Sequence, residues 1–64
     1  MALRLKVPSM ACSACAETIT RAVNGVDPVA KVEADPETKW VMVETQVAEA
    51  VVRGAIAAAG YPID

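Results

Sequence analysis

The chain has no histidine and no phenylalanine, and among its 64 residues it has only one tryptophan, one tyrosine and two cysteines. Without a basic patch or an aromatic cluster, the sequence carries no sign of nucleic-acid binding. No apolar run approaches the roughly 20 residues that span a bilayer, and no signal-peptide pattern precedes the cysteines. We therefore expect a cytoplasmic protein that does not insert into a membrane.

The apolar residues that are present are mostly small. They make up 55% of the chain, and most of them are alanine and valine. Such side chains suit helices that pack closely onto a sheet. The net charge of −2 comes from eight acidic and six basic residues dispersed along the chain. At this length we expect one ordered domain over residues 1–64, near the lower size limit for an independent core.

Hydrophobic periodicity divides the chain into six elements. Alternation with period two predicts strands, and apolar stripes at helical spacing predict helices. The predicted strands cover residues 3–7, 31–34, 39–45 and 61–64, and the predicted helices cover residues 13–24 and 47–59. Pro8 ends the first strand, while Asn24-Gly25 and Gly60 are placed to end the two helices. Pro62 restricts the last strand to a sheet edge.

This order is βαββαβ, in two similar halves of about 30 residues, and it predicts an α+β ferredoxin-like fold. We expect a four-stranded antiparallel sheet with both helices on one face. Val41 and Val43 are expected to point toward the helices. Trp40 and Met42 then lie on the open face, and Trp40 has cationic neighbours in the first strand.

The two cysteines carry most of the functional information. Cys12 falls in an exposed loop, and Cys15 lies in or just before the first helical turn, with Ser13 as a candidate N-cap. Unpaired N–H groups and the helix dipole favour thiolate over thiol at this position. A thiol pair at this spacing can hold one soft metal ion or cycle between dithiol and disulfide.

The chain alone cannot complete a four-ligand zinc site, because it has no histidine and no third cysteine. Two thiolates suit Cu(I), whereas Zn(II) would have to recruit water, a carboxylate or a second molecule. Ala11 offers a methyl group where a carboxylate would favour zinc or cadmium. Mercury is satisfied by two thiolates just as well. A thiol–disulfide redox protein remains an alternative, although that class usually needs a longer chain with more strands and helices.

The pattern Met10-x-Cys12-x-x-Cys15, followed by Gly25-Val26 and Ala59-Gly60-Tyr61, resembles the heavy-metal-associated domain over essentially the whole chain. This family includes cytosolic copper chaperones and N-terminal domains of copper-transporting P-type ATPases. The resemblance implies Cu(I) held by Cys12 and Cys15, with Met10 and Tyr61 beside the site. Tyr61 is expected to shield and tune the site without binding metal, and Met10 to pack inward and hold the loop.

The short chain is most similar to the small bacterial, cyanobacterial-type copper chaperones of this family. The resemblance implies a carrier, not an enzyme, that passes Cu(I) by thiolate exchange to the metal-binding domain of a copper-transporting P-type ATPase. A copper-bridged homodimer is a further expectation. Two alternatives stay open, namely a domain of such an ATPase and a zinc, cadmium or mercury carrier on the same scaffold. Met1, so close to the first strand, favours a separate protein over an ATPase domain.

Overall fold

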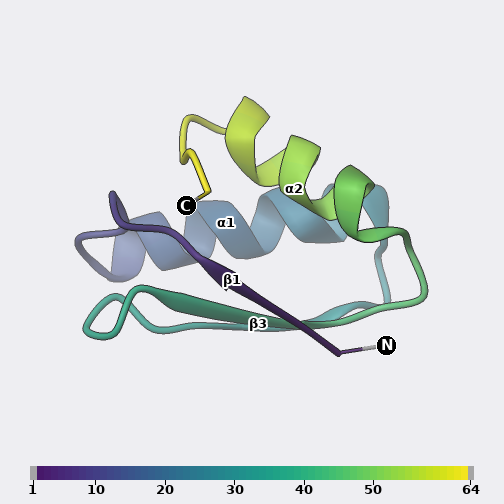
Figure 1. Cartoon of the computed structure of the whole chain (residues 1–64), viewed down its shortest axis with the longest axis horizontal. Coiled ribbons are helices and arrows are strands. Elements are labelled where there is room, and N and C mark those ends of the chain that lie inside the picture. The colour runs from purple at the N-terminus through teal and green to yellow at the C-terminus, as the bar shows by residue number, and fades with distance from the viewer. Residues whose placement is uncertain (1, 64) are drawn as a thin grey trace.

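The computed structural model describes residues 2–63, which form three strands and two helices in the order βαββα. The strands are β1 (Ala2–Lys6), β2 (Lys31–Ala34) and β3 (Trp40–Glu44), and the helices are α1 (Ser13–Val26) and α2 (Glu49–Ala58). The strands make one layer, and both helices lie on the same side of it (Figure 1). This arrangement confirms the α+β class and the single helical layer.

The sheet is antiparallel, with strand order β1–β3–β2. Leu3 pairs with Val43, and Leu5 pairs with Val41. Val32 of β2 also pairs with Val43 from the other side. Side chains that lie opposite each other in this register share one face of the sheet. Val41 and Val43 are buried, which confirms their predicted direction toward the helices.

The core consists of side chains of moderate size from every element except β2. Helix α1 contributes Ile19 and Val23, and α2 contributes Val52 and Ile56. Each of these pairs is spaced by four residues, so its members lie on one face of their helix. The complete buried apolar cluster is Leu3, Leu5, Val7, Met10, Ile19, Val23, Val41, Val43, Val52 and Ile56.

The open face of the sheet is polar around a single indole ring. The Arg4 guanidinium carbon lies 4.6 Å from the centroid of the Trp40 ring, and Lys6 Nζ lies 5.2 Å from it. Both distances are within the range of a cation–π contact. Trp40 is therefore half-buried under its neighbours on β1, while Met42 beside it is 40% exposed.

The predicted fourth strand is not present within residues 2–63. Residues 61–63 form no strand, and Asp64 lies outside the described residues. Gly60, with φ of 96°, turns the chain after α2, and the Tyr61 N–H donates to the Ile56 carbonyl at 3.3 Å. Pro62 has no N–H to donate to a sheet. Tyr61 and Ile63 pack against the core instead, so apolar contact takes the place of strand pairing.

The ends of both helices differ from the prediction. Helix α1 passes through Asn24-Gly25 and ends at Val26. The Asn24 amide donates to the carbonyls of Asp27 and Ala30, so this side chain stabilises the segment that follows the helix instead of stopping it earlier. Helix α2 begins at Glu49, two residues later than predicted, and Gly60 follows its end in the left-handed region, as expected of a residue after a helix.

The connection at the C-terminal end of α1 is held by a buried polar pair. The Thr45 hydroxyl donates to Asp27 Oδ2, and the Val29 N–H donates to Asp27 Oδ1 at 3.2 Å. The Val47 N–H donates to Thr45 Oγ1 at 3.1 Å. Asp27 and Thr45 are both buried. Their hydrogen bonds with Val29 and Val47 hold the chain where it leaves α1 and where it leaves β3. This pair therefore connects α1 to the start of α2.

Within residues 2–63, neither helix combines the length and the apolar character that crossing a bilayer demands.

Candidate metal centre

The two cysteines lie where the loop after β1 enters α1. The Met10 N–H donates to the Val7 carbonyl at 3.1 Å, which closes a turn around Pro8. Cys12 is the N-cap residue of α1, with extended backbone (φ −154°, ψ 173°), and its carbonyl accepts from the Ala16 N–H at 3.2 Å. The predicted N-cap at Ser13 is therefore wrong by one residue, since Ser13 is already helical.

The N-cap side chain does not satisfy the backbone at this helix start. Cys12 makes no side-chain capping hydrogen bond, and the first turn holds no acidic residue. The first N–H groups of a helix have no intrahelical acceptor and carry a partial positive charge. They remain available to stabilise negative charge on the thiolates.

The thiols are close to each other and accessible. Cys12 is exposed and Cys15 is half-buried, and both are free. Their sulfur atoms are 3.6 Å apart. The structure thus brings the two predicted ligands together on one loop–helix junction.

The environment favours the Cys15 thiolate. Hydrogen bonding by the Tyr61 hydroxyl is the largest cause that lowers the pKa of Cys15 to about 7, followed by the Ala11 backbone and the Cys12 side chain. Partial burial acts in the opposite direction. The same hydrogen bond with Cys15 raises the pKa of Tyr61, so the phenol stays protonated and serves as a donor. Tyr61 therefore lies at the site, on the side of Cys15.

Met10 is fully buried in the core and belongs to its apolar cluster. Its side chain packs inward. Its carbonyl accepts a hydrogen bond from Lys39 Nζ at 2.5 Å. Lys39 was not a candidate residue in the sequence, because a lysine after a turn carries no motif and this contact spans 29 residues.

The thiol pair is short of ligands for a closed site. In the part of the chain that the structure describes, no group of three or more His, Cys, Asp or Glu side chains could hold a metal ion. Two thiolates on one tetrahedral Zn(II), with bonds of about 2.3 Å, lie about 3.8 Å apart, and on a linear centre they would lie about 4.6 Å apart. The observed 3.6 Å puts both sulfur atoms within reach of one ion. Two protein ligands leave coordination positions open to a ligand from another molecule.

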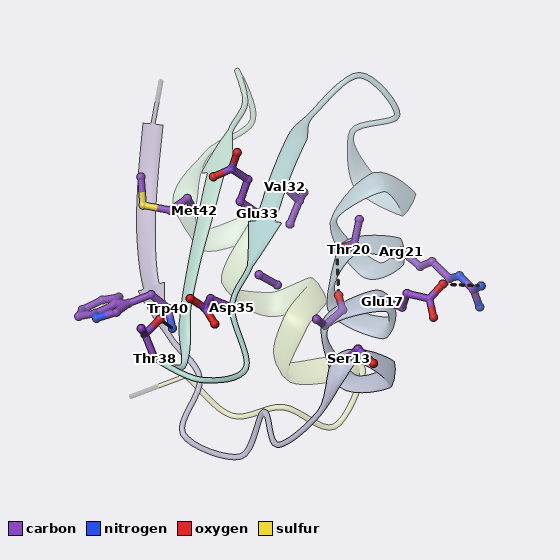
Figure 2. A pocket seen from close by; sticks show the side chains of 12 residues that line it. Ser13, Glu17, Thr20, Arg21, Val32, Glu33, Asp35, Thr38, Trp40 and Met42 are labelled. Carbon is purple, nitrogen blue, oxygen red and sulfur yellow. Dashed lines mark hydrogen bonds and ion pairs between the residues drawn. The ribbon is translucent and has the colours of Figure 1, made fainter.

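A groove of about 660 Å³ begins beside this site and runs between α1 and β2. Ser13 lies at its α1 end near the loop, and Glu17 and Arg21 project outward from the helix as an exposed ion pair of 3.7 Å (Figure 2). Trp40 and Met42 point away from α1 toward the open sheet face. The α1 side of the surface next to the thiols therefore carries the polar residues Ser13, Glu17 and Arg21.

Two adjacent free thiols at an uncapped helix start, on a small layered α+β scaffold, define a domain of the class that binds soft metal ions. Residues 4–62 match the sequence profile of the Heavy-metal-associated domain. This match spans most of the chain, and the chain belongs to the heavy-metal-associated domain family.

Solved structures of copper chaperones are similar to this chain throughout. A copper chaperone from Synechocystis PCC6803, in a trimeric form of a variant with tyrosine in place of histidine, is 42% identical, with a TM-score of 0.94 over 97% of this chain and 98% of that one. A cyanobacterial copper metallochaperone solved in solution is 41% identical, with a TM-score of 0.82 over the full length of both chains.

A third relative transports a different metal. The periplasmic component of mercuric transport from Pseudomonas aeruginosa is 41% identical over 61 residues, which are 91% of this chain and 67% of that protein. The family and its copper-chaperone-like character are therefore established, while family membership by itself allows more than one soft metal.

Proposed function

We propose that this protein is a cytosolic Cu(I) chaperone whose residues 1–64 form one metal-binding domain. Cys12 and Cys15 hold the ion, and thiolate exchange delivers it to a copper-transporting P-type ATPase. The observation that carries the proposal is the pair of free thiols 3.6 Å apart at an accessible helix start. Soft thiolates in low number suit Cu(I) better than Zn(II), which takes four ligands in structural sites.

The geometry supports an exchange mechanism. A thiolate of the partner forms a third bond to the copper that Cys12 and Cys15 hold, and a bond to one of these two sulfurs then breaks. The copper stays in the Cu(I) state, and the departing thiolate remains an anion or takes a proton from water. Exposure of Cys12 gives the partner access, and the low pKa of Cys15 makes its thiolate a good leaving group.

The residues around the thiols have separate roles in this proposal. Tyr61 donates to the Cys15 thiolate and covers that side of the site without binding the ion. Met10 anchors the loop in the core. The similarity to copper chaperones over the full length of the chain supports a carrier that performs no catalytic reaction.

Metal preference is tested by competition of the reduced protein against chromophoric chelators, with Cu(I), Zn(II) and Hg(II) measured in parallel. We expect one tightly held Cu(I) per chain and much weaker Zn(II). Zinc retained as tightly as copper would overturn the copper proposal in favour of a zinc or cadmium carrier. Failure to bind any of the ions, with ready disulfide formation, would favour a redox role.

A mercury carrier is the second candidate, because the mercuric transport relative is 41% identical to this chain. Affinity alone does not separate the two, since Hg(II) binds two thiolates tightly. Transfer does separate them. Copper passing to the metal-binding domain of a copper ATPase faster than to free chelator supports the first proposal, and absence of such transfer contradicts it.

The partner surface is tested by reversing one charge beside the thiols. Arg21 lies on α1 and pairs with Glu17, while Arg53 lies on α2 and pairs with Glu49 at 2.7 Å. We expect Arg21→Glu to slow copper transfer to the ATPase domain and Arg53→Glu, the matched control, to leave it unchanged. Equal rates for both variants would remove α1 from the docking surface.

Copper-bridged homodimers follow from the open coordination positions, since two molecules supply four thiolates. Sedimentation of the protein at increasing copper loading tests this expectation. A second sedimenting species should appear with copper and disappear with chelator. A monomer at every loading would contradict it.

A further inference from the structure

Lys39 joins the β2–β3 hairpin to the loop of residues 7–12, which leads into α1. It does so through two groups, its backbone carbonyl and its side-chain ammonium. Its carbonyl accepts from the Val7 N–H at 2.8 Å, and its ammonium donates to the Met10 carbonyl at 2.5 Å. Val7 and Met10 are themselves the two ends of the turn that precedes the cysteines. One residue therefore holds both ends of this turn from outside.

The backbone at Lys39 is unusual. With φ of 70°, it is the one non-glycine residue in the left-handed region within residues 2–63. Its N–H donates to the Asp35 carbonyl at 2.8 Å and closes the hairpin turn. Glycine or asparagine adopts this conformation at lower cost than lysine. Residues with such a backbone conformation cluster at functional sites, where the surrounding structure holds them in place.

The Lys39 side chain supplies a charged hydrogen-bond donor that glycine would lack. The ammonium reaches the Met10 carbonyl, in a partly buried contact, two residues before Cys12. A charged donor on a carbonyl makes a stronger hydrogen bond than a neutral donor. The Met10 side chain is fully buried in the core. Met10 is therefore held by its side chain in the core and by its carbonyl at Lys39.

We propose that Lys39 is a positioning residue for the metal site, which keeps the loop in the geometry that presents Cys12 and Cys15 to one ion. This inference rests on the proposed metal binding by these two thiols. Lys39 acts on the loop backbone through the Met10 carbonyl and does not touch the ion. Holding the loop in its binding geometry removes an ordering cost from metal capture and slows metal loss.

The test compares Lys39→Met, which keeps most of the stem without the charge, with Lys39→Arg, which keeps a cationic donor. Lys31→Met is the matched control, because Lys31 is an exposed lysine at the start of β2 that lies opposite Glu44 in the sheet register. Cu(I) affinity is measured by chelator competition, and amide hydrogen exchange reports residues 9–15. We expect Lys39→Met to weaken Cu(I) binding about tenfold and to speed loop exchange.

Rescue distinguishes positioning from general stabilisation. Lys39→Arg should recover most of the affinity, and Lys31→Met should match the unaltered protein. Lys39→Gly removes the ammonium but relieves the left-handed backbone, so it should lose affinity while its urea midpoint is kept. Unaltered affinity and loop exchange in Lys39→Met and Lys39→Gly would overturn the proposal. An affinity loss in Lys39→Arg equal to that in Lys39→Met would overturn it as well.

Failure of the parent function has a different signature. If the unaltered protein binds no soft metal ion, the assignment of Cys12 and Cys15 falls and the role of Lys39 toward the site falls with it. If it binds Hg(II) or Zn(II) in preference to Cu(I), only the copper assignment falls. The tenfold effect of Lys39→Met is then expected for the preferred ion.

Discussion

The two ends of helix α1 treat polar atoms in opposite ways. At its C-terminal end, Asp27 and Thr45 are buried and hydrogen-bonded to each other, and Asn24 donates to two carbonyls. At its N-terminal end, Cys12 makes no side-chain capping hydrogen bond, and both cysteines are free of disulfides. One end thus uses its polar side chains for the fold, and the other keeps two cysteines that form no disulfide.

The residues that stabilise the fold and the residues proposed to bind metal therefore lie at opposite ends of α1. The 14 residues of α1 place its ends about 20 Å apart. Substitutions at such a distance, with no shared partners, have nearly additive effects. A change at the thiol end should therefore alter metal binding without unfolding the domain, and a change at the other end should do the reverse.

The largest expected effect is at the thiol end. Cys12→Ala removes one of two ligands and should lower Cu(I) affinity by several orders of magnitude. Since Cys12 is exposed and makes no capping hydrogen bond, the urea midpoint of the metal-free protein should stay unchanged. Chelator competition and urea unfolding on the same preparation check both statements. Residual tight binding would show that the site uses another ligand.

The next effect is at the opposite end. Asp27→Ala removes the carboxylate that accepts from the Thr45 hydroxyl and from the Val29 N–H, and we expect a loss of about 2 kcal/mol in the free energy of unfolding. Cu(I) affinity should not change. Thr45→Val and the double variant complete a cycle that measures the coupling of the pair. Weaker copper binding in Asp27→Ala would show that the two ends communicate.

A smaller effect is expected at Tyr61. Tyr61→Phe removes the hydroxyl that lowers the pKa of Cys15, so alkylation of Cys15 should shift to higher pH. Because the pKa of Cys15 is about 7 in the folded protein and lies below its ordinary value of 9.0, the metal-free protein gains stability as pH rises between these values, and Tyr61→Phe should reduce that gain. Cu(I) affinity should change by less than about tenfold. A larger loss would make Tyr61 a ligand.

The smallest effect lies away from both ends. Gly54 is exposed within α2, and an added Cβ would meet no atom within 4 Å. Gly54→Ala should therefore stabilise the domain by about 0.5–1 kcal/mol through lower backbone entropy of the unfolded chain. Urea unfolding measures the gain, and copper affinity is the control. Destabilisation would reveal a close neighbour of this helix face.

Local sequence patterns predicted most of the fold. The strands β1, β2 and β3 and both helices follow their hydrophobic periods, because each period reports which face of an element is buried. The errors lie at the ends of the helices and of the chain. Residues 61–63 alternate like a strand but pack on the core, and Asn24-Gly25 resembles a helix stop although α1 continues to Val26. At such positions tertiary contacts outweigh local propensity.

The candidate site divides in the same way. The placement of Cys12 and Cys15 at a helix start was readable from the sequence, since loop, spacing and helical stripe are local features. The position of Cys12 as the N-cap residue was not, because a one-residue shift of a helix end depends on backbone geometry. The contact of Lys39 with Met10 was not readable from the sequence either.

The sequence alone determined the layered α+β scaffold, the buried faces and the thiol pair, because periodicity and short spacings are recorded in neighbouring residues. The tertiary structure decided which distant polar groups meet. Lys39 reaches Met10 across 29 residues, and Thr45 reaches Asp27 across 18. A hydrogen bond needs two atoms within about 3 Å, and only the packed chain brings such residues to that distance.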